Sequence, residues 1–182
     1  AHVPRTPNPR FVGKTTLGPR GDAIVEFDST VGQVTATLDR LGLAENTLVI
    51  ISSDNGPVLD DGYQDEAVTK AGDHKPAGPW RGGKSRAFEA ATRVPFIVRW
   101  PARIRPRASE ALIGQIDLIA SFASLTKQQL GENDAPDSFN MLPTLLGESD
   151  QSRPYLVRQG AAASIVRDGW KYIEPVKNAK PV

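Results

Sequence analysis

The sequence contains no cysteine among its 182 residues. Disulfide bonds, thiolate metal sites and a cysteine nucleophile are therefore excluded within this chain. The absence does not reveal the compartment, because secreted proteins can also lack disulfides. Histidine is scarce as well, with two residues, so few side chains can transfer a proton near neutral pH.

A strong charge of either sign and a long apolar run are also missing. The 22 Lys and Arg residues nearly balance the 21 Asp and Glu residues, which gives no case for a dominant nucleic-acid or membrane partner. No run approaches the roughly 18 apolar residues of a membrane span. The hydrophobic fraction of 39% is that of an ordinary globular protein with a real core.

The first half of the chain has the pattern of an α/β unit. Apolar residues recur at steps of three and four from Ile24 to Leu41, which predicts a helix with Asp22 as its N-cap and Gly42 as its stop. The run "NTLVIISS" (46–53) is apolar on both parities, as in a strand covered on both faces. A helix that leads into such a strand indicates a parallel sheet.

The second half adds shorter elements. We expect a buried strand over 93–100, a helix over 116–126 and a short helix between 142 and 147. Asp168-Gly169 separates two strand-like runs, 164–167 and 170–173, which predicts a tight hairpin. Two sheet strands are few for the expected fold, so we expect the chain to be part of something larger.

Two oxygen-bearing side chains, Asp54 and Asn55, follow the strand run directly. In open parallel sheets, sites form beyond the carboxyl ends of strands, and these oxygens suit a hard cation such as Ca²⁺ or Mg²⁺. The same residues with Gly56 are also typical of a plain turn. The long polar loop after Pro57 favours ligation, but both interpretations stay open.

A second candidate is the basic segment around Lys84. Gly82 and Gly83 precede the lysine and would let the backbone approach an anion closely, while Arg81 and Arg86 add positive potential. A lone Gly-Gly-Lys is more often an ordinary surface lysine. The two histidines, His2 and His74, lie in loop-like segments and by default are exposed without a role.

Taken in order, these segments resemble the type I sulfatases (arylsulfatases) of the alkaline-phosphatase-like superfamily. The match covers most of the chain and is carried by a His-x-Pro loop, a long helix before an Asp-Asn-Gly strand end, a Gly-Gly-Lys loop before a Val-Pro-Phe strand, and a final helix, loop and hairpin. These stretches are "AHVPRTPNPRF", "GDAIVEFDSTVGQVTATLDRLGLAENTLVIISSDNGP", "HKPAGPWRGGKSRAFEAATRVPFIVRWP", "IGQIDLIASFASLT", "DSFNMLPTLLG" and "RDGWKYI".

The resemblance implies roles for individual residues. Asp54 and Asn55 would coordinate Ca²⁺ (or Mg²⁺), and Lys84 would contact the sulfate. His2 would contact the sulfate oxygens or assist the leaving alcohol. His74, Arg81 and Arg86 are secondary substrate-binding candidates. A divalent cation and a lysine would stabilise the charge that develops as a sulfate ester is cleaved.

The chain departs from the family in two respects. Glu89-Ala90-Ala91 stands where the family has Glu-Gly-Gly, and alanine does not freely take a positive φ, which would displace the Lys84 loop. The family's formylglycine nucleophile motif and its paired N-terminal aspartates are absent, so we expect the isolated chain to be inactive.

The resemblance therefore implies a partial alkaline-phosphatase-like α/β fold, a mixed or parallel sheet with flanking helices. Residues 1–126 would be the C-terminal part of the catalytic domain and 127–182 a small antiparallel subdomain. Its partners would be a sulfate ester, aryl or carbohydrate, and the N-terminal part of the same fold.

Three other interpretations remain. The chain could belong to a phosphatase or phosphodiesterase of the same superfamily, although only two histidines are available for the extra metal ligands. It could be a non-catalytic module that binds an anionic glycan through Lys84, Arg81, Arg86 and His2. It could also be a metal-free α/β domain in which Asp54-Asn55 forms a turn.

Overall fold

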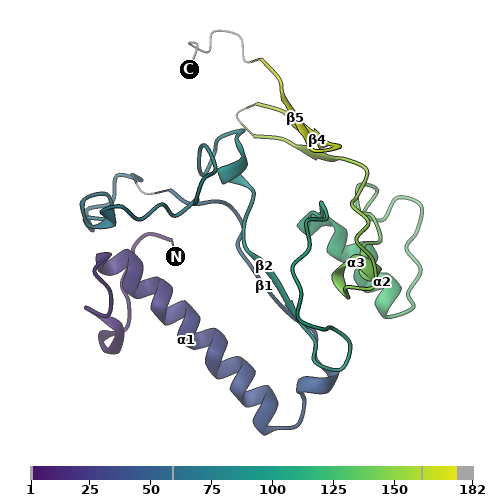
Figure 1. Ribbon diagram of the computed structural model, residues 1–182, viewed down its shortest axis with the longest axis horizontal. Helices are drawn as coiled ribbons and strands as arrows, with labels where there is room; N and C mark the ends of the chain where they lie inside the picture. Colours follow the sequence, from purple (N-terminus) through teal and green to yellow (C-terminus); the bar gives the residue numbers. More distant parts are fainter. Residues whose placement is uncertain (1, 59, 161, 176–182) are drawn as a thin grey trace. The chain divides into compact units, whose positions relative to one another are not determined.

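The computed structural model describes residues 2–58, 60–160 and 162–175 (Figure 1). It divides into two compact units, one ending at Phe96 and the other beginning at Ile97. The predicted division after residue 126 stays a prediction. No helix in the described ranges is long and apolar enough to cross a membrane.

Helix α1 spans Gly18–Arg40 and begins four residues before the predicted start at Asp22. Pro19 lies in its first turn, where a missing backbone N–H costs nothing. The helix ends as expected, because Gly42 has a φ of +67° and so takes the left-handed conformation that stops a helix.

Asp22 is not the N-cap of α1, so that prediction is wrong. Its carboxylate accepts hydrogen bonds from the backbone N–H groups of Gly13 at 2.8 Å and Thr15 at 2.9 Å, and from the Thr15 hydroxyl at 3.1 Å. These bonds, with that of Gly13 first, lower the pKa of Asp22. The residue therefore fastens the preceding loop to the helix.

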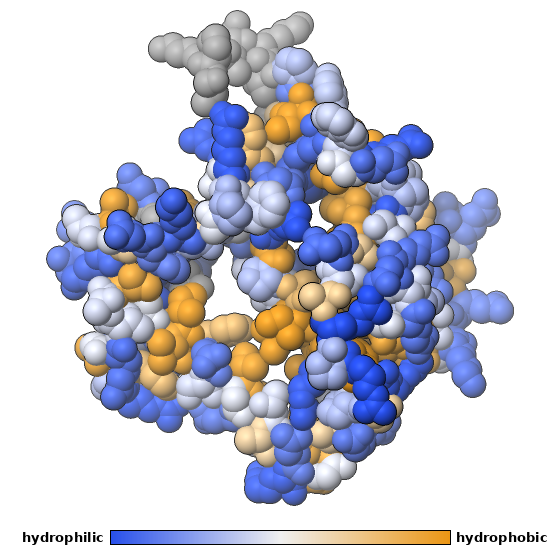
Figure 2. All heavy atoms as spheres, in the orientation of Figure 1, coloured by the Kyte–Doolittle hydropathy of each residue, from blue (hydrophilic) through white to orange (hydrophobic). Residues whose placement is uncertain are grey.

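Strand β1 spans Val49–Ser52, and all four of its residues are half-buried. The sequence predicted this strand correctly. It also predicted a strand covered on both faces, and within the described chain that part of the prediction is wrong. On α1, Ile24, Phe27 and Val34 are each about half exposed, and so is Leu41 directly after the helix. An open groove of about 260 Å³ lies between α1 and β1 and is lined mainly by their apolar side chains. Figure 2 shows hydrophobic surface over this part of the molecule.

The rest of the first unit consists of connecting segments before α1, between α1 and β1 and between β1 and β2, with short 3₁₀ turns. These are Pro9–Phe11, Ala44–Asn46, Thr69–Ala71 and Glu89–Ala91. Strand β2, Phe96–Arg99, starts at the last residue of this unit, three residues later than predicted.

The second unit is organised around a buried ion pair. A 3₁₀ turn at Gln115–Asp117 leads into α2, Leu118–Leu125, and α3 spans Leu142–Leu145. Arg153 Nη1 lies 3.0 and 3.1 Å from the two carboxylate oxygens of Asp117, and both side chains are 2% exposed. Asp117 also accepts from the backbone N–H groups of Gly114 and Phe139, so its charge is fully compensated.

Three short antiparallel strands complete this unit. They are β3, Leu156–Arg158, β4, Ser164–Arg167, and β5, Trp170–Ile173. The β4–β5 hairpin is confirmed, and its turn residues Asp168 and Gly169 both have positive φ, as a type I′ turn requires. Strand β3 was not predicted, because three residues are too few to establish an alternating pattern.

Replacing Arg153 by methionine should lower the free energy of unfolding by about 3–5 kcal/mol, because it leaves Asp117 buried without its counter-ion. The matched control is Arg167→Met. Arg167 pairs with Asp168, but these side chains are 71% and 81% exposed, so its loss should cost under about 1 kcal/mol. Urea unfolding of both variants measures the difference, and equal losses would contradict a special role for the buried pair.

Candidate functional site

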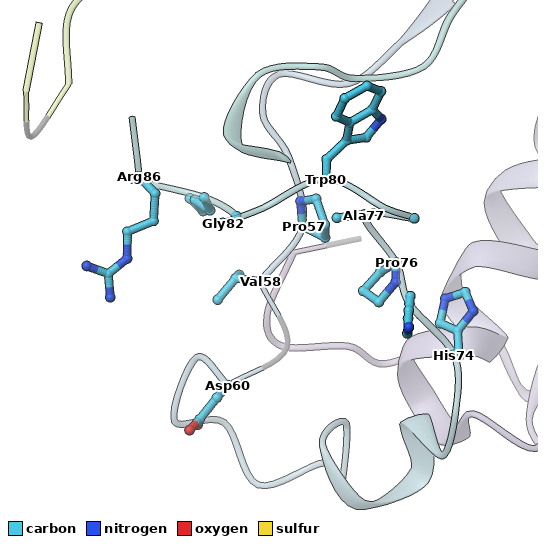
Figure 3. A pocket seen from close by; sticks show the side chains of 13 residues that line it. Pro57, Val58, Asp60, His74, Pro76, Ala77, Trp80, Gly82 and Arg86 are labelled. Atoms are coloured by element: carbon cyan, nitrogen blue, oxygen red, sulfur yellow. The ribbon is translucent and has the colours of Figure 1, made fainter. Parts of the chain in front are cut away.

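An open groove of about 640 Å³ in the first unit is lined by three of the seven predicted site residues, His74, Lys84 and Arg86 (Figure 3). One wall comes from the segment that follows β1, and the other from the loop before β2. The lining residues are Pro57, Val58, Asp60, His74, Lys75, Pro76, Ala77, Gly78, Trp80, Gly82, Gly83, Lys84 and Arg86. Three of them are lysine or arginine and one is an aspartate, so the groove favours anions.

Two backbone hydrogen bonds join the walls of this groove. The N–H of Lys84 donates to the carbonyl of Pro57 at 2.9 Å, and the N–H of Gly56 donates to the carbonyl of Ala91 at 2.8 Å. The approach is too close for side chains. A Cβ on Gly56 would lie 1.6 Å from the Ala90 carbonyl oxygen, and one on Gly83 would lie 2.5 Å from that of Pro57.

Asp54 and Asn55 stand just before this junction. Neither Asn55 nor Gly56 has a positive φ, so the segment is not the type I′ turn that an Asn-Gly pair favours. The Asn55 amide nitrogen donates to the carbonyl of Gly56 at 2.8 Å, which leaves the amide oxygen as the ligand atom. Glycine at 56 therefore serves a close backbone contact and not a turn.

The donor set fits part of a Ca²⁺ shell. Asp54 is exposed, and its carboxylate has only a long contact of 3.4 Å with the Ser53 hydroxyl among the hydrogen bonds described for it. Ca²⁺ takes six to eight oxygen ligands. Within the described ranges, no group of three or more His, Cys, Asp or Glu is arranged to hold a metal. Asp54 and Asn55 could hold a cation only together with further ligands.

The basic residues separate into two kinds. Lys84, Lys75 and Arg86 line the groove. Arg81 does not, because its guanidinium carbon lies 3.9 Å from the centroid of the Phe88 ring in a cation–π contact. The structure thus brings Arg86, but not Arg81, to the same groove as Lys84.

The two histidines also separate. His74 lines the groove, with its backbone N–H held by the Ala71 carbonyl at 2.9 Å. His2 is exposed and is not among the lining residues, and its Nδ1 lies 2.9 Å from the neighbouring Val3 carbonyl oxygen.

Glu89–Ala91 forms a 3₁₀ turn in which both alanines are buried and neither has a positive φ. The turn therefore does not require the conformational freedom of glycine, and the expected alanine strain is absent. The turn supplies the Ala91 carbonyl that accepts from Gly56.

The sequence interpretation missed a buried cluster that supports the groove. The Arg5 side chain, 1% exposed, donates to both carboxylate oxygens of Asp61, at 2.9 and 3.2 Å, and to Asp65. Arg20 on α1 donates to the carbonyl of Val58. These bonds hold the segment that begins at the groove wall. No local pattern links residues 56 and 60 positions apart, so only the charges themselves could have suggested the pair.

The hydrogen bond from Arg5 is also the main reason that the pKa of Asp65 lies below its usual value, and the same bond raises the pKa of Arg5. The Ala67 backbone N–H adds a further bond to Asp65. Both ionised forms are therefore favoured in the folded chain.

With this geometry established, the chain can be compared with known proteins. The family model described as Sulfatase matches residues 2–128. The chain belongs to the sulfatase family. An N-acetylgalactosamine-6-O-sulfatase of Bacteroides thetaiotaomicron is 54% identical over 176 residues, which is 96% of this chain and 34% of that sulfatase. Human arylsulfatase A is 32% identical over 155 residues, which is 85% of this chain and 29% of the enzyme.

Solved structures agree with the sulfatase assignment. One structure, from work on the metabolism of multiple glycosaminoglycans by Bacteroides thetaiotaomicron, matches with a TM-score of 0.95 at 53% identity and covers 99% of this chain and 38% of its own. A Pseudoalteromonas sulfatase matches at 24% identity with a TM-score of 0.76, which shows the fold alone. The alkaline-phosphatase-like α/β fold class is thus confirmed. This sulfatase chain spans about a third of the length of its relatives.

Replacing Gly56 by alanine should unfold or displace the junction, because the new Cβ has no room beside the Ala90 carbonyl. We expect a loss of more than about 2 kcal/mol in the free energy of unfolding. The control is Gly32→Ala on the exposed side of α1, where nothing lies within 4 Å and alanine should stabilise the helix by about 0.5–1 kcal/mol. Thermal unfolding of the two variants should give shifts of opposite sign.

The Asp65 pKa makes stability depend on acid pH. Because the folded-state pKa is lowered, ionised Asp65 stabilises the fold above its unfolded pKa of about 4, and this contribution is lost as pH falls through the folded value. Asp65→Asn should therefore lower stability at pH 7 and flatten the decline below about pH 4. Asp73→Asn, at an exposed site in the same loop, is the control. Urea unfolding at each pH measures the free energy of unfolding. If this free energy falls below about pH 4 as steeply in Asp65→Asn as in the wild type, the prediction is refuted.

Proposed function

We propose that this chain supplies the lysine and part of the metal shell of a sulfatase that hydrolyses sulfate esters of carbohydrates. The observation that carries the proposal is the pair of hydrogen bonds from Lys84 to Pro57 and from Gly56 to Ala91. They tie the loop of the lysine to the segment that follows Asp54 and Asn55. A sulfate-binding cation and two metal-type oxygen ligands thus belong to adjoining segments of one unit.

Each residue has a role in this proposal. Lys84 binds a sulfate oxygen and stabilises the charge that grows as the ester bond breaks. Asp54 and Asn55 contribute two oxygen ligands to Ca²⁺ or Mg²⁺, and the metal, when bound, supplies further stabilisation of that charge. His74 is better supported than His2 as the proton donor to the leaving alcohol, because it lines the same groove as Lys84.

In this proposal the nucleophile lies outside this chain, which has no cysteine and no serine followed by Pro and Arg two and four positions on. The family resemblance assigns that role to a formylglycine, and the other metal ligands to aspartates of the same N-terminal part. The exposed apolar groove between α1 and β1 supports a further packing partner of this kind, because burying about half of each large side chain there would stabilise the assembly. By itself the chain is expected to be inactive.

The carbohydrate substrate rests on the relatives. The 54%-identical relative is named for its action on a sulfated amino sugar. The groove agrees with such a ligand, since its volume falls in the range of about 300–1,000 Å³ that holds small organic ligands, and it combines cations with apolar surface.

A chimera tests the proposal. This chain replaces the aligned third of the 54%-identical Bacteroides relative, and hydrolysis of a 6-sulfated N-acetylgalactosamine is measured. The chimera should turn over the ester, and Lys84→Ala in it should lower kcat by about 100-fold or more. The control Lys70→Ala removes an exposed lysine that pairs with Glu66 outside the groove.

Two results would contradict the proposal. One is an inactive chimera that folds normally by circular dichroism. The other is a Lys84→Ala chimera within about twofold of the parent, which would leave Lys84 without a role in the transition state.

A further inference from the structure

The groove carries more positive charge than one sulfate ester requires. Lys84, Lys75 and Arg86 line it together with a single carboxylate, Asp60. Among the described residues, no ion pair involves any of these three cations. They also make no cation–π contact there, whereas the nearby Arg81 and Arg93 lie over the rings of Phe88 and Trp80.

The cations are also spread along the groove. Figure 3 shows Arg86 and His74 toward opposite ends, with Pro57 and Val58 between them. Lys75 adjoins His74 in sequence and lines the same groove. The groove therefore has cations toward both ends, and the apolar surface between them can accept the C–H face of a sugar ring.

Arg86 is well suited to a second anion. Its backbone N–H donates to the Gly83 carbonyl at 3.1 Å, which fixes the start of the side chain to the Lys84 loop. Ser85, between the two, has a φ of +66°, a conformation that non-glycine residues adopt rarely and often at ligand-binding sites. A guanidinium binds a carboxylate or a sulfate with two parallel hydrogen bonds, which makes it selective for such groups.

We propose that Arg86 binds a second anionic group, carried by the sugar next to the sulfated one. The chain would then favour sulfated oligosaccharides with a neighbouring acidic residue over sulfated sugars with neutral neighbours. This inference rests on the proposed function, because it takes the sulfate at Lys84 as given. The group that Arg86 binds is an anion, either a uronic-acid carboxylate or a second sulfate.

Calorimetry on the wild-type chain tests the inference with four probes. They are N-acetylgalactosamine 6-sulfate alone, and the same sugar joined to a neutral hexose, to a uronic acid or to a sulfated hexose. At least one acidic disaccharide should bind about tenfold or more tightly than the neutral one, as expected for a charge-assisted contact. The two acidic arms show whether carboxylate or sulfate is preferred.

Arg86→Gln should abolish this preference while changing the affinity for the monosaccharide by less than about twofold. Arg10→Gln is the matched control, with the same loss of charge in the same unit, since Arg10 lies over Phe11 and outside the groove. It should keep the full preference. A loss of preference in Arg10→Gln as well would show a general charge effect and overturn the proposal.

The other outcomes separate the two proposals. Equal affinity of the wild-type chain for neutral and acidic disaccharides overturns the role of Arg86 and leaves the sulfatase function standing. If no probe binds the wild-type chain at millimolar concentration, the role of Arg86 is overturned. The activity of the chimera then decides separately whether the sulfatase proposal also fails.

Discussion

The candidate site depends on one constraint, the close backbone contact between the segment after β1 and the loop before β2. Gly56 and Gly83 permit it, because a Cβ at either position would collide with a carbonyl group. The contact turns two loops that are distant in sequence into the walls of one groove. Loops seldom hold functional groups in place unless such contacts replace the regular hydrogen bonds of a helix or strand.

Local patterns were sufficient where the physics is local. Asp168-Gly169 predicted its hairpin because the turn itself demands positive φ, and Gly42 predicted the end of α1 for the same reason. The prediction that Asp22 caps α1 was wrong because a carboxylate near a helix start can accept hydrogen bonds from backbone N–H groups on either side of it. Here it accepts from Gly13 and Thr15, which precede the helix, and the helix starts at Gly18.

The groove itself could not be derived from the sequence. In the sequence, nothing distinguishes Arg81 from Arg86. Only the structure shows that Arg81 lies over the Phe88 ring while Arg86 lines the groove. Arg5 likewise gives no sign that it binds Asp61 and Asp65 across some sixty residues. The family resemblance nominated Lys84, Asp54 and Asn55, but their surroundings follow from tertiary contacts that no single-sequence pattern encodes.

The half-buried α1 and β1 show a different limit. Their apolar periodicity predicts burial, yet Phe27 and Val34 are about half exposed and every residue of β1 is only partly covered. A sequence pattern records the environment for which a helix was selected, and it does not say which chain provides that environment. The relatives are about three times as long, so their fold contains enough further chain to cover these faces. The proposed metal site follows the same reasoning. Asp54 and Asn55 would be two members of a shell whose other ligands come from further chain, as the cover of the apolar faces would.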